Sequence, residues 1–251
     1  MDWQEWHQSY QDNASSFSRR LAIIQSHIDT WLDTEAPAQP VVLSICAGDG
    51  RDLLQVLADR EDRDRVSGVL IEWDGRLSSQ AQDQIAAAGL HRIEVRCSDA
   101  GAVSAYTGAL PADLVILAGV FGNISDADVR KVIRQLPAMC RPGARVIWTR
   151  HRNPPDLTGA IRGWLLAEHF AEKSFTAPED AVFSVGVADY VGPPVPWDPP
   201  NILFSSVSYG DCVNEQSTNV GDLTLSVPMA CFVGTAGTSD LAAARLRSHR
   251  I

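Results

Sequence analysis

The sequence lacks the excess of basic residues that a nucleic-acid-binding protein carries. Its 21 lysine and arginine residues are outnumbered by 31 aspartate and glutamate residues, so the formal net charge is −10. Because binding to a nucleic acid relies on neutralising phosphates with a positive surface, we expect no nucleic-acid partner. Three arginines near the C-terminus, Arg245, Arg247 and Arg250, are typical of a solvated helix face.

Long apolar runs are also missing. No segment approaches the ~20 apolar residues that a membrane-spanning helix needs, and the N-terminus, MDWQEWHQSYQDN, is too polar for a secretory signal. We therefore expect a soluble, cytoplasmic protein with no membrane partner. With 251 residues the chain is long enough for one large domain, or for one domain with an appendage.

The cysteines are too widely spaced for a disulfide framework or a zinc site. There are five, an odd number, and no two form a CxxC pair. We expect no bound metal, and three of the cysteines lie in apolar stretches where they would pack as small buried side chains. The five are Cys46, Cys97, Cys140, Cys212 and Cys231.

Short apolar, β-rich segments alternate with segments of helical periodicity from residue 41 to about residue 190. The predicted strands are 41–46, 66–73, 92–97, 112–119 and 144–150, followed by a hairpin of 172–178 and 181–190. The predicted helices between them are 51–60, 76–89, 125–140 (with Ser125 as its N-cap) and 156–170. This alternation predicts an α/β fold: a doubly wound, mostly parallel seven-stranded sheet with a C-terminal antiparallel hairpin and helices on both faces.

Composition divides the chain into three parts. Residues 1–35 contain an aromatic N-terminal segment and a helical stretch ahead of the sheet. Residues 36–206 hold the sheet and a proline-rich strap, GPPVPWDPP (192–200), and LFSS (203–206) marks the predicted end of the core. Residues 207–251 are rich in Ser, Thr and Gly, which gain little burial on folding. We expect them to form a partly ordered or flexible tail, away from the ligand site and dispensable for binding.

A glycine loop follows the first predicted strand, in VVLSICAGDGRDLL (41–54). Only Gly48 and Gly50 match the G-x-G-x-x-G fingerprint of dinucleotide-binding folds, in which a third glycine lies in the helix. Asp49 and Asp52 flank the loop, and two carboxylates at a helix N-terminus would repel a pyrophosphate while tolerating a cationic amino group. The loop therefore disfavours a dinucleotide. The alternative is an ordinary strand-to-helix turn, with Asp52 stabilising the helix through its dipole.

Acidic residues also follow the next two predicted strands. Glu72 ends the second strand, where a carboxylate can accept hydrogen bonds from both hydroxyls of a ribose. Asp99 follows the third strand, where it can accept a hydrogen bond from the amino group of adenine. Because carboxyl ends of parallel strands share an edge, these residues suit an adenosine that is joined to an amino acid and lacks phosphates. In the alternative, Glu72 is a strand-end charge and Asp99 begins a helix.

These motifs make the sequence similar to the class I S-adenosylmethionine-dependent methyltransferases over roughly residues 40–190. VLSICAGDGRDL resembles the family's first motif, VLIEWD the second-strand motif that ends in the ribose-binding acid, and VRCSDA the adenine-contacting segment. ADLVILAGVFGNI resembles the fourth-strand motif beside the methyl group, and LPAMCRPGARVIWTRH the fifth-strand motif with its Pro-Gly turn. The resemblance implies S-adenosyl-L-methionine as cofactor and assigns its contacts to Cys46, Ala47, Gly48, Asp49, Gly50, Asp52, Glu72, Trp73, Asp99, Ala100, Gly119 and Val120.

Two positions depart from the family's pattern. The family usually carries an acid at the position of Ser44, and its loss is expected to weaken the ordering of the loop. The family usually carries a glycine at the position of Cys46, so a cysteine side chain must fit near the sulfonium. Neither change removes a group that performs chemistry.

Methyl transfer forces no catalytic motif on the sequence, because the cofactor is already activated and the protein mainly supplies alignment and, for some acceptors, a base. His151 follows the fifth predicted strand and is the candidate general base, with an unperturbed pKa near ~6.5. His7 and Tyr10 are further catalytic candidates in the N-terminal segment (1–35), which by resemblance forms a helical lid. The alternatives are a hydrogen-bonded surface role for His151 and core packing for the N-terminal aromatics.

The segment GVFGNI after the fourth strand lacks the D/N-P-P-Y/F pattern of amino- and base-methylating enzymes. Together with the negative charge, this favours a small-molecule acceptor that is methylated on oxygen or carbon. Two other functions stay open. One is a non-catalytic S-adenosylmethionine-binding or scaffold protein, and the other, which the missing third glycine disfavours, is an NAD(P)-dependent oxidoreductase.

Overall fold

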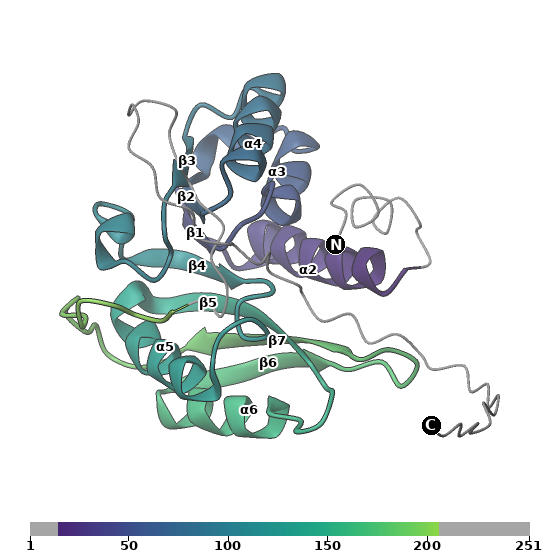
Figure 1. Ribbon diagram of the computed structural model, residues 1–251. Helices are drawn as coiled ribbons and strands as arrows, with labels where there is room; N and C mark the ends of the chain where they lie inside the picture. Colours follow the sequence, from purple (N-terminus) through teal and green to yellow (C-terminus); the bar gives the residue numbers. More distant parts are fainter. Residues whose placement is uncertain (1–14, 206–251) are drawn as a thin grey trace, which may run out of the picture.

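The computed structural model describes residues 15–205 and shows one seven-stranded sheet between two layers of helices (Figure 1). The strands are β1 (Val41–Ile45), β2 (Ser67–Glu72), β3 (Ile93–Cys97), β4 (Ala112–Leu117), β5 (Cys140–His151), β6 (Phe170–Thr176) and β7 (Phe183–Tyr190). Their order in the sheet is β3-β2-β1-β4-β5-β7-β6. Neighbouring strands are parallel except where β7 pairs with β5 and β6. The predicted fold class, including the antiparallel hairpin, is confirmed.

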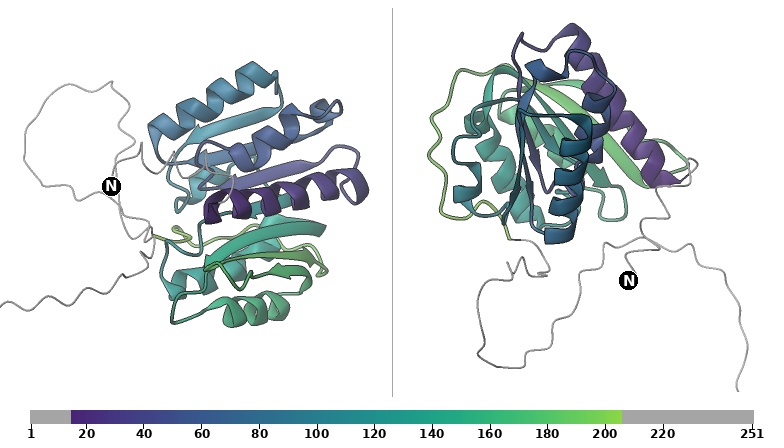
Figure 2. Two further views of the ribbon diagram at one scale, coloured as in Figure 1. Left: turned by 90° about the vertical axis from the view of Figure 1, so that its right-hand side faces the viewer. Right: turned by 90° about the horizontal axis from the view of Figure 1, so that it is seen from above.

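Helices cover both faces of the sheet (Figure 2). One face carries α2 (Ser16–Thr34), α3 (Arg51–Ala58) and α4 (Gly75–Ala88), and the other carries α5 (Asp126–Met139) and α6 (Thr158–Ala167). Two short 3-10 helices, η1 (Arg63–Arg65) and η2 (Val103–Tyr106), lie in the connections. None of the described helices combines the length and the apolarity that crossing a membrane would require.

The central strands are buried on both sides. Val42 packs in the core beside α2 and α3, whereas Leu43 and Ile45 pack in the core beside α5. A strand between two helical layers needs apolar side chains on both of its faces. This arrangement explains why the strand segments of the sequence are unbroken apolar runs rather than alternating ones.

The fifth strand is longer than predicted. α5 begins after the predicted N-cap Ser125, whose hydroxyl accepts the Asp128 amide, and it passes into β5 at Cys140 without a loop. The pairing with β4 then shifts, because the chain bulges between Cys140 and Arg145. Gly143 has a φ of 86° in this bulge, a conformation that glycine adopts without steric cost. The Pro-Gly turn implied by the resemblance is therefore a bulge inside a strand.

α2 forms a fixed layer of the domain. Its inner face packs against α3 and β7, and the side chains buried there are Ile24, Ile28, Trp31 and Leu32. Of the predicted N-terminal lid, residues 16–34 are therefore part of the core rather than a cover. Residues 1–14, which include His7 and Tyr10, lie outside the described residues, so their roles stay predictions.

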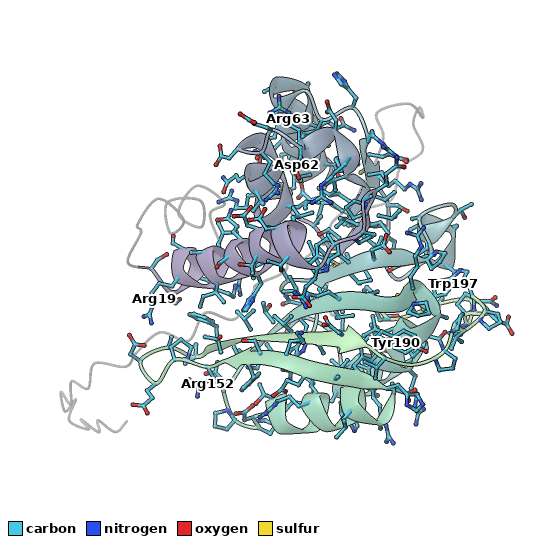
Figure 3. All side chains as sticks on the ribbon, turned by 180° about the vertical axis from the view of Figure 1, so that it is seen from behind. Arg19, Asp62, Arg63, Arg152, Tyr190 and Trp197 are labelled. Atoms are coloured by element: carbon cyan, nitrogen blue, oxygen red, sulfur yellow. The ribbon has the colours of Figure 1, made fainter. Side chains whose placement is uncertain are left out.

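The first turns of α2 lie at the edge of the sheet where β5 ends. Arg19, in the first turns of α2, forms an ion pair with Asp180 in the turn between β6 and β7, with 2.7 Å between Nη1 and Oδ2. Since β7 runs antiparallel to β5, this turn lies beside the carboxyl end of β5. Figure 3 shows Arg19 on the same side of the molecule as Arg152, which follows β5.

After β7 the chain returns across the domain as a strap, residues 191–205, drawn in yellow-green in Figure 1. Leu203 and Phe204, near its end, are 0% and 2% exposed. The described core therefore includes both residues, which fall within the predicted boundary at 203–206. The predicted tail, 207–251, lies outside the described residues.

Candidate functional site

The carboxyl ends of β1, β2 and β3 bring the predicted cofactor residues to one edge. Ile45 at the end of β1 pairs with Ile71, and Glu72 pairs with Cys97 at the end of β3. The glycine loop, Glu72 and Asp99 therefore follow neighbouring strands at the same level. β1 also pairs with β4, so the strand order reverses beside the loop. Open α/β sheets bind their ligands at such a switch point.

Three residues of the glycine loop adopt a left-handed backbone. The φ angle is 53° at Cys46, 60° at Gly48 and 73° at Gly50. Gly50 is enclosed, because an added Cβ would lie 2.6 Å from Leu70 Cδ2 and 2.7 Å from Leu54 Cδ1. Gly48 borders open space, with nothing within 4 Å of an added Cβ. Gly50 thus closes the turn into α3, whereas Gly48 leaves room for a ligand beside the backbone.

Cys46 stands where the family usually has glycine. A left-handed conformation costs an L-residue roughly 1–2 kcal/mol, so its φ of 53° marks local strain. Cys46 is half-buried, and the desolvation of its thiol, reinforced by Glu72 and Asp99, raises the thiol pKa far above its ordinary value. Cys46 therefore stays protonated at neutral pH and serves as a small side chain within the site.

Glu72 ties the second strand to the loop. Its Oε2 accepts a hydrogen bond from the Gly48 amide at 2.7 Å, and its Oε1 accepts one from the Asp74 amide at 2.8 Å. Glu72 is only 8% exposed, and burial raises its pKa, while the bonds to the amides oppose that rise. Each carboxylate oxygen can accept more than one hydrogen bond. Glu72 therefore has capacity left for the hydroxyls of a ribose.

Glutamines from two helices also hold the glycine loop, although no motif pointed to them. Gln84 of α4 donates to the carbonyl of Asp49 at 2.9 Å, and Gln25 of α2 donates to the carbonyl of Arg51 at 2.9 Å. Ser44, at the position of the family's acid, is buried, and its hydroxyl has no hydrogen-bond partner. Side chains from neighbouring elements therefore support this loop in place of an acid on β1.

The charge of the loop differs from the sequence-based expectation at one of its two acids. Asp49 forms an ion pair with Arg51, with 2.8 Å between Oδ1 and Nε, so it adds little to the predicted repulsion of a pyrophosphate. Asp52 is buried in the first turn of α3 and accepts the Leu53 amide at 2.9 Å. Burial raises the pKa of Asp52 to about 6. The acids beside the loop that form no ion pair among the described residues are therefore Asp52 and Glu72.

Ala47 and Trp73, two further predicted cofactor residues, lie at the same edge. The Ala47 amide donates to the carbonyl of Ile71 at 2.9 Å, which fixes the start of the loop on β2. Trp73 follows β2 directly, and its carbonyl accepts the Cys97 thiol at 3.6 Å. Both residues are half-buried. Their contacts place them at the site, and their cofactor contacts stay predictions.

Asp99 is held within its own turn. Its Oδ1 accepts the Gly101 amide at 2.7 Å, and its carbonyl accepts the Ala102 amide at 3.0 Å. Ala100 is buried, and its carbonyl accepts the Tyr106 hydroxyl at 2.6 Å. Asp99 and Ala100 therefore belong to a closed turn, and the next helical segment, η2, starts only after this turn.

The carboxyl ends of β4 and β5 form the other half of this edge. Gly119 has a φ of 82°, and its amide donates to Thr149 Oγ1 at 2.7 Å. Its carbonyl accepts the side-chain amide of Asn123 at 2.6 Å. An added Cβ at Gly119 would have no neighbour within 4 Å, whereas Val120 is 2% exposed. Gly119 therefore borders open space, while Val120 packs into the core.

His151, the candidate base, is the last residue of β5. Its Nδ1 is buried without a hydrogen-bond partner, and its Cδ2 lies 3.5 Å from the place of a Cβ on Gly122. Burial lowers the pKa of the imidazole below its ordinary value, and the charge of Arg150 lowers it further. The imidazole is therefore neutral at pH 7, as a general base must be.

Buried polar atoms without partners occur in this histidine and in both residues next to it in the chain. Within residues 15–205, four buried side-chain nitrogen or oxygen atoms lack a hydrogen-bond partner, and three of them lie in consecutive residues. These three are Arg150 Nε, His151 Nδ1 and Arg152 Nε. Native proteins pair nearly all of their buried polar groups, so three such atoms in consecutive residues set the end of β5 apart from the rest of the described chain.

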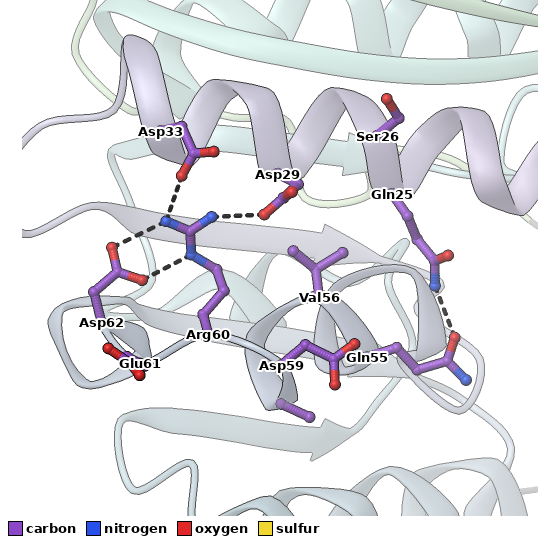
Figure 4. Close-up of a pocket in the computed structure, with 11 residues that line it drawn as sticks. Gln25, Ser26, Asp29, Asp33, Gln55, Val56, Asp59, Arg60, Glu61 and Asp62 are labelled. Carbon is purple, nitrogen blue, oxygen red and sulfur yellow. Dashed lines mark hydrogen bonds and ion pairs between the residues drawn. The ribbon is translucent and has the colours of Figure 1, made fainter.

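An open groove of about 1000 Å³ runs elsewhere, between α2 and α3 (Figure 4). Arg60 lies in it and forms ion pairs with three aspartates, Asp29, Asp33 and Asp62. None of the predicted cofactor residues lines this groove. It is therefore distinct from the site that the motifs indicate.

Comparison with protein-family models finds no match, and comparison with curated proteins finds none either. Solved structures, in contrast, resemble the chain. The CurJ carbon methyltransferase superposes with a TM-score of 0.58 at 12% identity, over 73% of this chain and 57% of that one. An O-methyltransferase family protein from Burkholderia thailandensis gives a TM-score of 0.52 at 16% identity, over 68% of this chain and 55% of that one.

A possible exported protein from Bordetella parapertussis gives a TM-score of 0.51 at 19% identity, over 68% of this chain and 67% of that one. The chain spans little more than half the length of the two methyltransferases, 57% and 55%. Identities this low show a shared fold and do not transfer an activity. At that level the predicted resemblance is confirmed: the chain has the Rossmann-like fold of the class I S-adenosylmethionine-dependent methyltransferases.

Proposed function

We propose that this protein binds S-adenosylmethionine and transfers its methyl group to a small-molecule acceptor. One observation carries the proposal: the Glu72 carboxylate, at the end of β2, is hydrogen-bonded at 2.7 Å to the Gly48 amide of an open glycine loop. In this position the carboxylate can accept ribose hydroxyls while the loop backbone faces the rest of the ligand. Asp99, one strand further along, is the partner that we propose for the adenine amino group.

The residues at this edge fit such a cofactor. Gly48 and Gly119 both border open space, since an added Cβ at either would have no neighbour within 4 Å. The carboxyl groups of Asp52 and Glu72 lie beside the loop, which suits a ligand with an ammonium and a sulfonium group. When bound, the cofactor supplies an activated methyl group.

The chain itself contributes alignment and, for a hydroxyl or an acidic carbon, removal of a proton. His151 is neutral at pH 7, so its imidazole can accept that proton. Burial keeps its pKa low, and the charge of the neighbouring Arg150 lowers it further. His7 and Tyr10 remain candidates for a role at the acceptor.

We propose an acceptor that is methylated on oxygen or carbon. The loop after β4 lacks the D/N-P-P-Y/F pattern, and a net charge of −10 disfavours a nucleic-acid substrate. The structural neighbours named as carbon and O-methyltransferases share only the fold with this chain, so they do not decide which atom is methylated. The cytoplasm is the compartment that we propose for this reaction.

Isothermal titration calorimetry with S-adenosylmethionine, S-adenosylhomocysteine and NADH tests the binding step. We expect heat from the first two ligands and none from NADH. Glu72→Gln keeps the size of the side chain and removes its charge, so it should weaken binding, whereas Glu94→Gln, at an exposed position of β3, should not. Absence of binding by both sulfur ligands at millimolar concentration would overturn the proposal.

Two alternatives call for further measurements. A non-catalytic S-adenosylmethionine-binding protein would also give heat, so release of S-adenosylhomocysteine must be measured with a panel of small hydroxylated and carbonyl-activated compounds. NADH is included because the ion pair between Asp49 and Arg51 offsets part of the negative charge that was expected to repel a dinucleotide. Binding of NADH in preference to the sulfur ligands would favour an oxidoreductase.

A further inference from the structure

The strap of residues 191–205 runs from the end of β7 to the turn after β3. Near its start, the Tyr190 hydroxyl donates to the carbonyl of Pro193 at 2.6 Å. In its middle, Trp197 packs on Tyr106 of η2, with 5.8 Å between the ring centroids. Figure 3 shows Tyr190 and Trp197 on one side of the molecule. The strap is thus attached before it reaches the turn.

The end of the strap is built into the turn that carries Asp99. The Leu203 amide donates to the carbonyl of Gly101 at 2.8 Å, and Ile202 forms a β-bridge with Ala102. Leu203 and Phe204 are buried. The approach is close, because a Cβ on Gly101 would overlap the carbonyl oxygen of Phe204. The strap and the turn can meet in this way only if residue 101 has no side chain.

The same glycine holds the Asp99 side chain. The Gly101 amide donates to Asp99 Oδ1 at 2.7 Å, while the Gly101 carbonyl accepts from the strap. Gly101 therefore lies between Leu203 and the Asp99 carboxylate. Tyr106, on which Trp197 of the strap packs, donates to the neighbouring carbonyl of the same turn. The strap thus supports the turn at two places.

We propose that the strap determines which base the cofactor site accepts, by fixing the position of Asp99 through Gly101. The proposal rests on the proposed function, in which Asp99 accepts a hydrogen bond from the adenine amino group. A carboxylate distinguishes an amino group from a carbonyl oxygen only while it is held in place. If the carboxylate can turn away, it loses the hydrogen bond to an amino group and is no longer repelled by a carbonyl oxygen. Residues 202–204 are therefore positioning residues for base specificity.

The test uses the full-length chain and two ligands that differ only in the base. S-adenosylhomocysteine carries the amino group, and S-inosylhomocysteine carries a carbonyl oxygen in its place. Gly101→Ala should displace the strap, and Gly163→Ala is the matched control, because it lies in α6 with nothing within 4 Å of the new Cβ. We expect the wild type and the control to prefer the adenosyl ligand by about tenfold or more, and Gly101→Ala to lose about tenfold of that preference.

A second variant reaches the same contact from the other side. Leu203→Pro leaves Gly101 intact and removes the amide that donates to it. Hydrogen exchange of residues 99–106, measured by mass spectrometry, reports whether the strap has been released in either variant. We expect faster exchange together with a lower preference for the adenosyl ligand, produced mainly by weaker binding of that ligand.

Each possible result either supports or contradicts the strap proposal. Faster exchange with an unchanged preference would overturn the proposal, and so would unchanged exchange in both variants, because the strap would then not hold the turn. If the wild type binds the two ligands equally well, the strap proposal fails and the proposed function stands. If the wild type binds neither, the proposed function fails and the strap proposal falls with it.

Discussion

The two halves of the sheet's carboxyl edge differ in how completely their polar groups are paired. At the ends of β2 and β3 the acids accept backbone amides, Glu72 from Gly48 and Asp99 from Gly101. At the end of β5, in contrast, the described residues leave His151 Nδ1 and the Nε atoms of the two flanking arginines buried without hydrogen-bond partners. The acids of the first half are therefore tied to backbone amides, and one buried side-chain atom there, Ser44 Oγ, lacks a partner, whereas the second half has three such atoms among the described residues.

This difference suits a division of work between a cofactor and an acceptor. Because the cofactor is the same in every turnover, a fixed backbone geometry can bind it, and short motifs of glycines and acids encode such geometry. The acceptor, in contrast, would bind to side chains that gain hydrogen-bond partners only when the acceptor is present. The proposed function thus explains why one half of the edge carries recognisable motifs and the other carries a single candidate, His151.

Deleting α2 should disrupt both halves together, and it has the largest expected effect. α2 packs against α3, which follows the glycine loop, and against β7, which lies beside β5. It buries four large apolar side chains, each of which contributes roughly 1.5–3 kcal/mol, so their sum rivals the roughly 5–15 kcal/mol that stabilises a whole domain. A chain that starts at residue 35 should be unfolded by circular dichroism. A chain that starts at residue 15 should fold, and only this shorter deletion tests the predicted lid.

Glycine-to-alanine substitutions should separate an enclosed glycine of the first half, Gly50, from an open glycine of the second half, Gly119. At Gly50 a left-handed strain of roughly 1–2 kcal/mol adds to an overpacking cost of about 1–3 kcal/mol, because the new Cβ would meet Leu70 and Leu54. At Gly119 only the strain is expected, since the space around it is open. Urea denaturation should therefore show a loss of roughly 2–5 kcal/mol for Gly50→Ala and about 1–2 kcal/mol for Gly119→Ala. Equal losses would contradict the difference in packing between these two glycines.

Ligand binding should depend on one half and turnover on both. Glu72→Ala removes a charge-assisted hydrogen bond worth roughly 1.5–3 kcal/mol, so the affinity for S-adenosylhomocysteine should fall about ten- to a hundredfold in calorimetry. His151→Ala should keep the affinity of the wild type and lose turnover. Unchanged affinity in Glu72→Ala would show that the ribose is held elsewhere, and weakened affinity in His151→Ala would place the histidine in the cofactor site.

The contributions of the two halves to the free energy of unfolding should also change with pH in opposite directions. Burial raises the pKa of Asp52 from 3.8 to about 6, so its contribution to stability is full below pH 3.8 and is lost as the pH rises through 6. The pKa of His151 is lowered, so its contribution is present above the ordinary pKa of histidine and is lost as the pH falls. Asp52→Asn should therefore raise the free energy of unfolding at pH 7.5 by about 3 kcal/mol, and by much less at pH 4. The same gain at both pH values in urea denaturation would argue against a raised pKa.

The sequence predicted those parts of the site that follow directly from the ends of the apolar strand segments. Strand ends are visible as the ends of apolar runs, and parallel strands bring their carboxyl ends to one edge, so Gly48, Glu72 and Asp99 could be placed together. The fold class followed from the same alternation of strands and helices. Both inferences need only short stretches of sequence and one rule about parallel sheets.

The contacts that the sequence did not reveal depend on how distant elements pack. Gln84 and Gln25 reach the loop from the faces of two helices, and neither glutamine belongs to a motif. The pairing of Asp49 with Arg51 depends on the turn between them rather than on their order. The strap is a proline-rich segment whose docking depends on two buried residues, Leu203 and Phe204, and on a glycine in a distant turn.

Removing residues 207–251 should have the smallest effect. The last described anchors of the strap are Leu203 and Phe204, and a chain that stops after residue 206 keeps both of them. The described chain ends at Ser205, directly after the strap joins the Asp99 turn. That residues 207–251 lie away from the ligand site stays a prediction, which this deletion tests.

The shortened chain should bind S-adenosylhomocysteine within about threefold of the wild type, a difference of under ~1 kcal/mol. The tail is rich in Ser, Thr and Gly, so ordering it over the site would cost roughly 1–2 kcal/mol of backbone entropy per residue with little apolar burial in return. A chain that stops after residue 199 is the matched comparison. It lacks Leu203 and should bind the adenosyl ligand about tenfold more weakly if the strap positions Asp99. A chain ending at residue 206 that is soluble and monodisperse but no longer binds would make the tail part of the site and move the domain boundary beyond the strap.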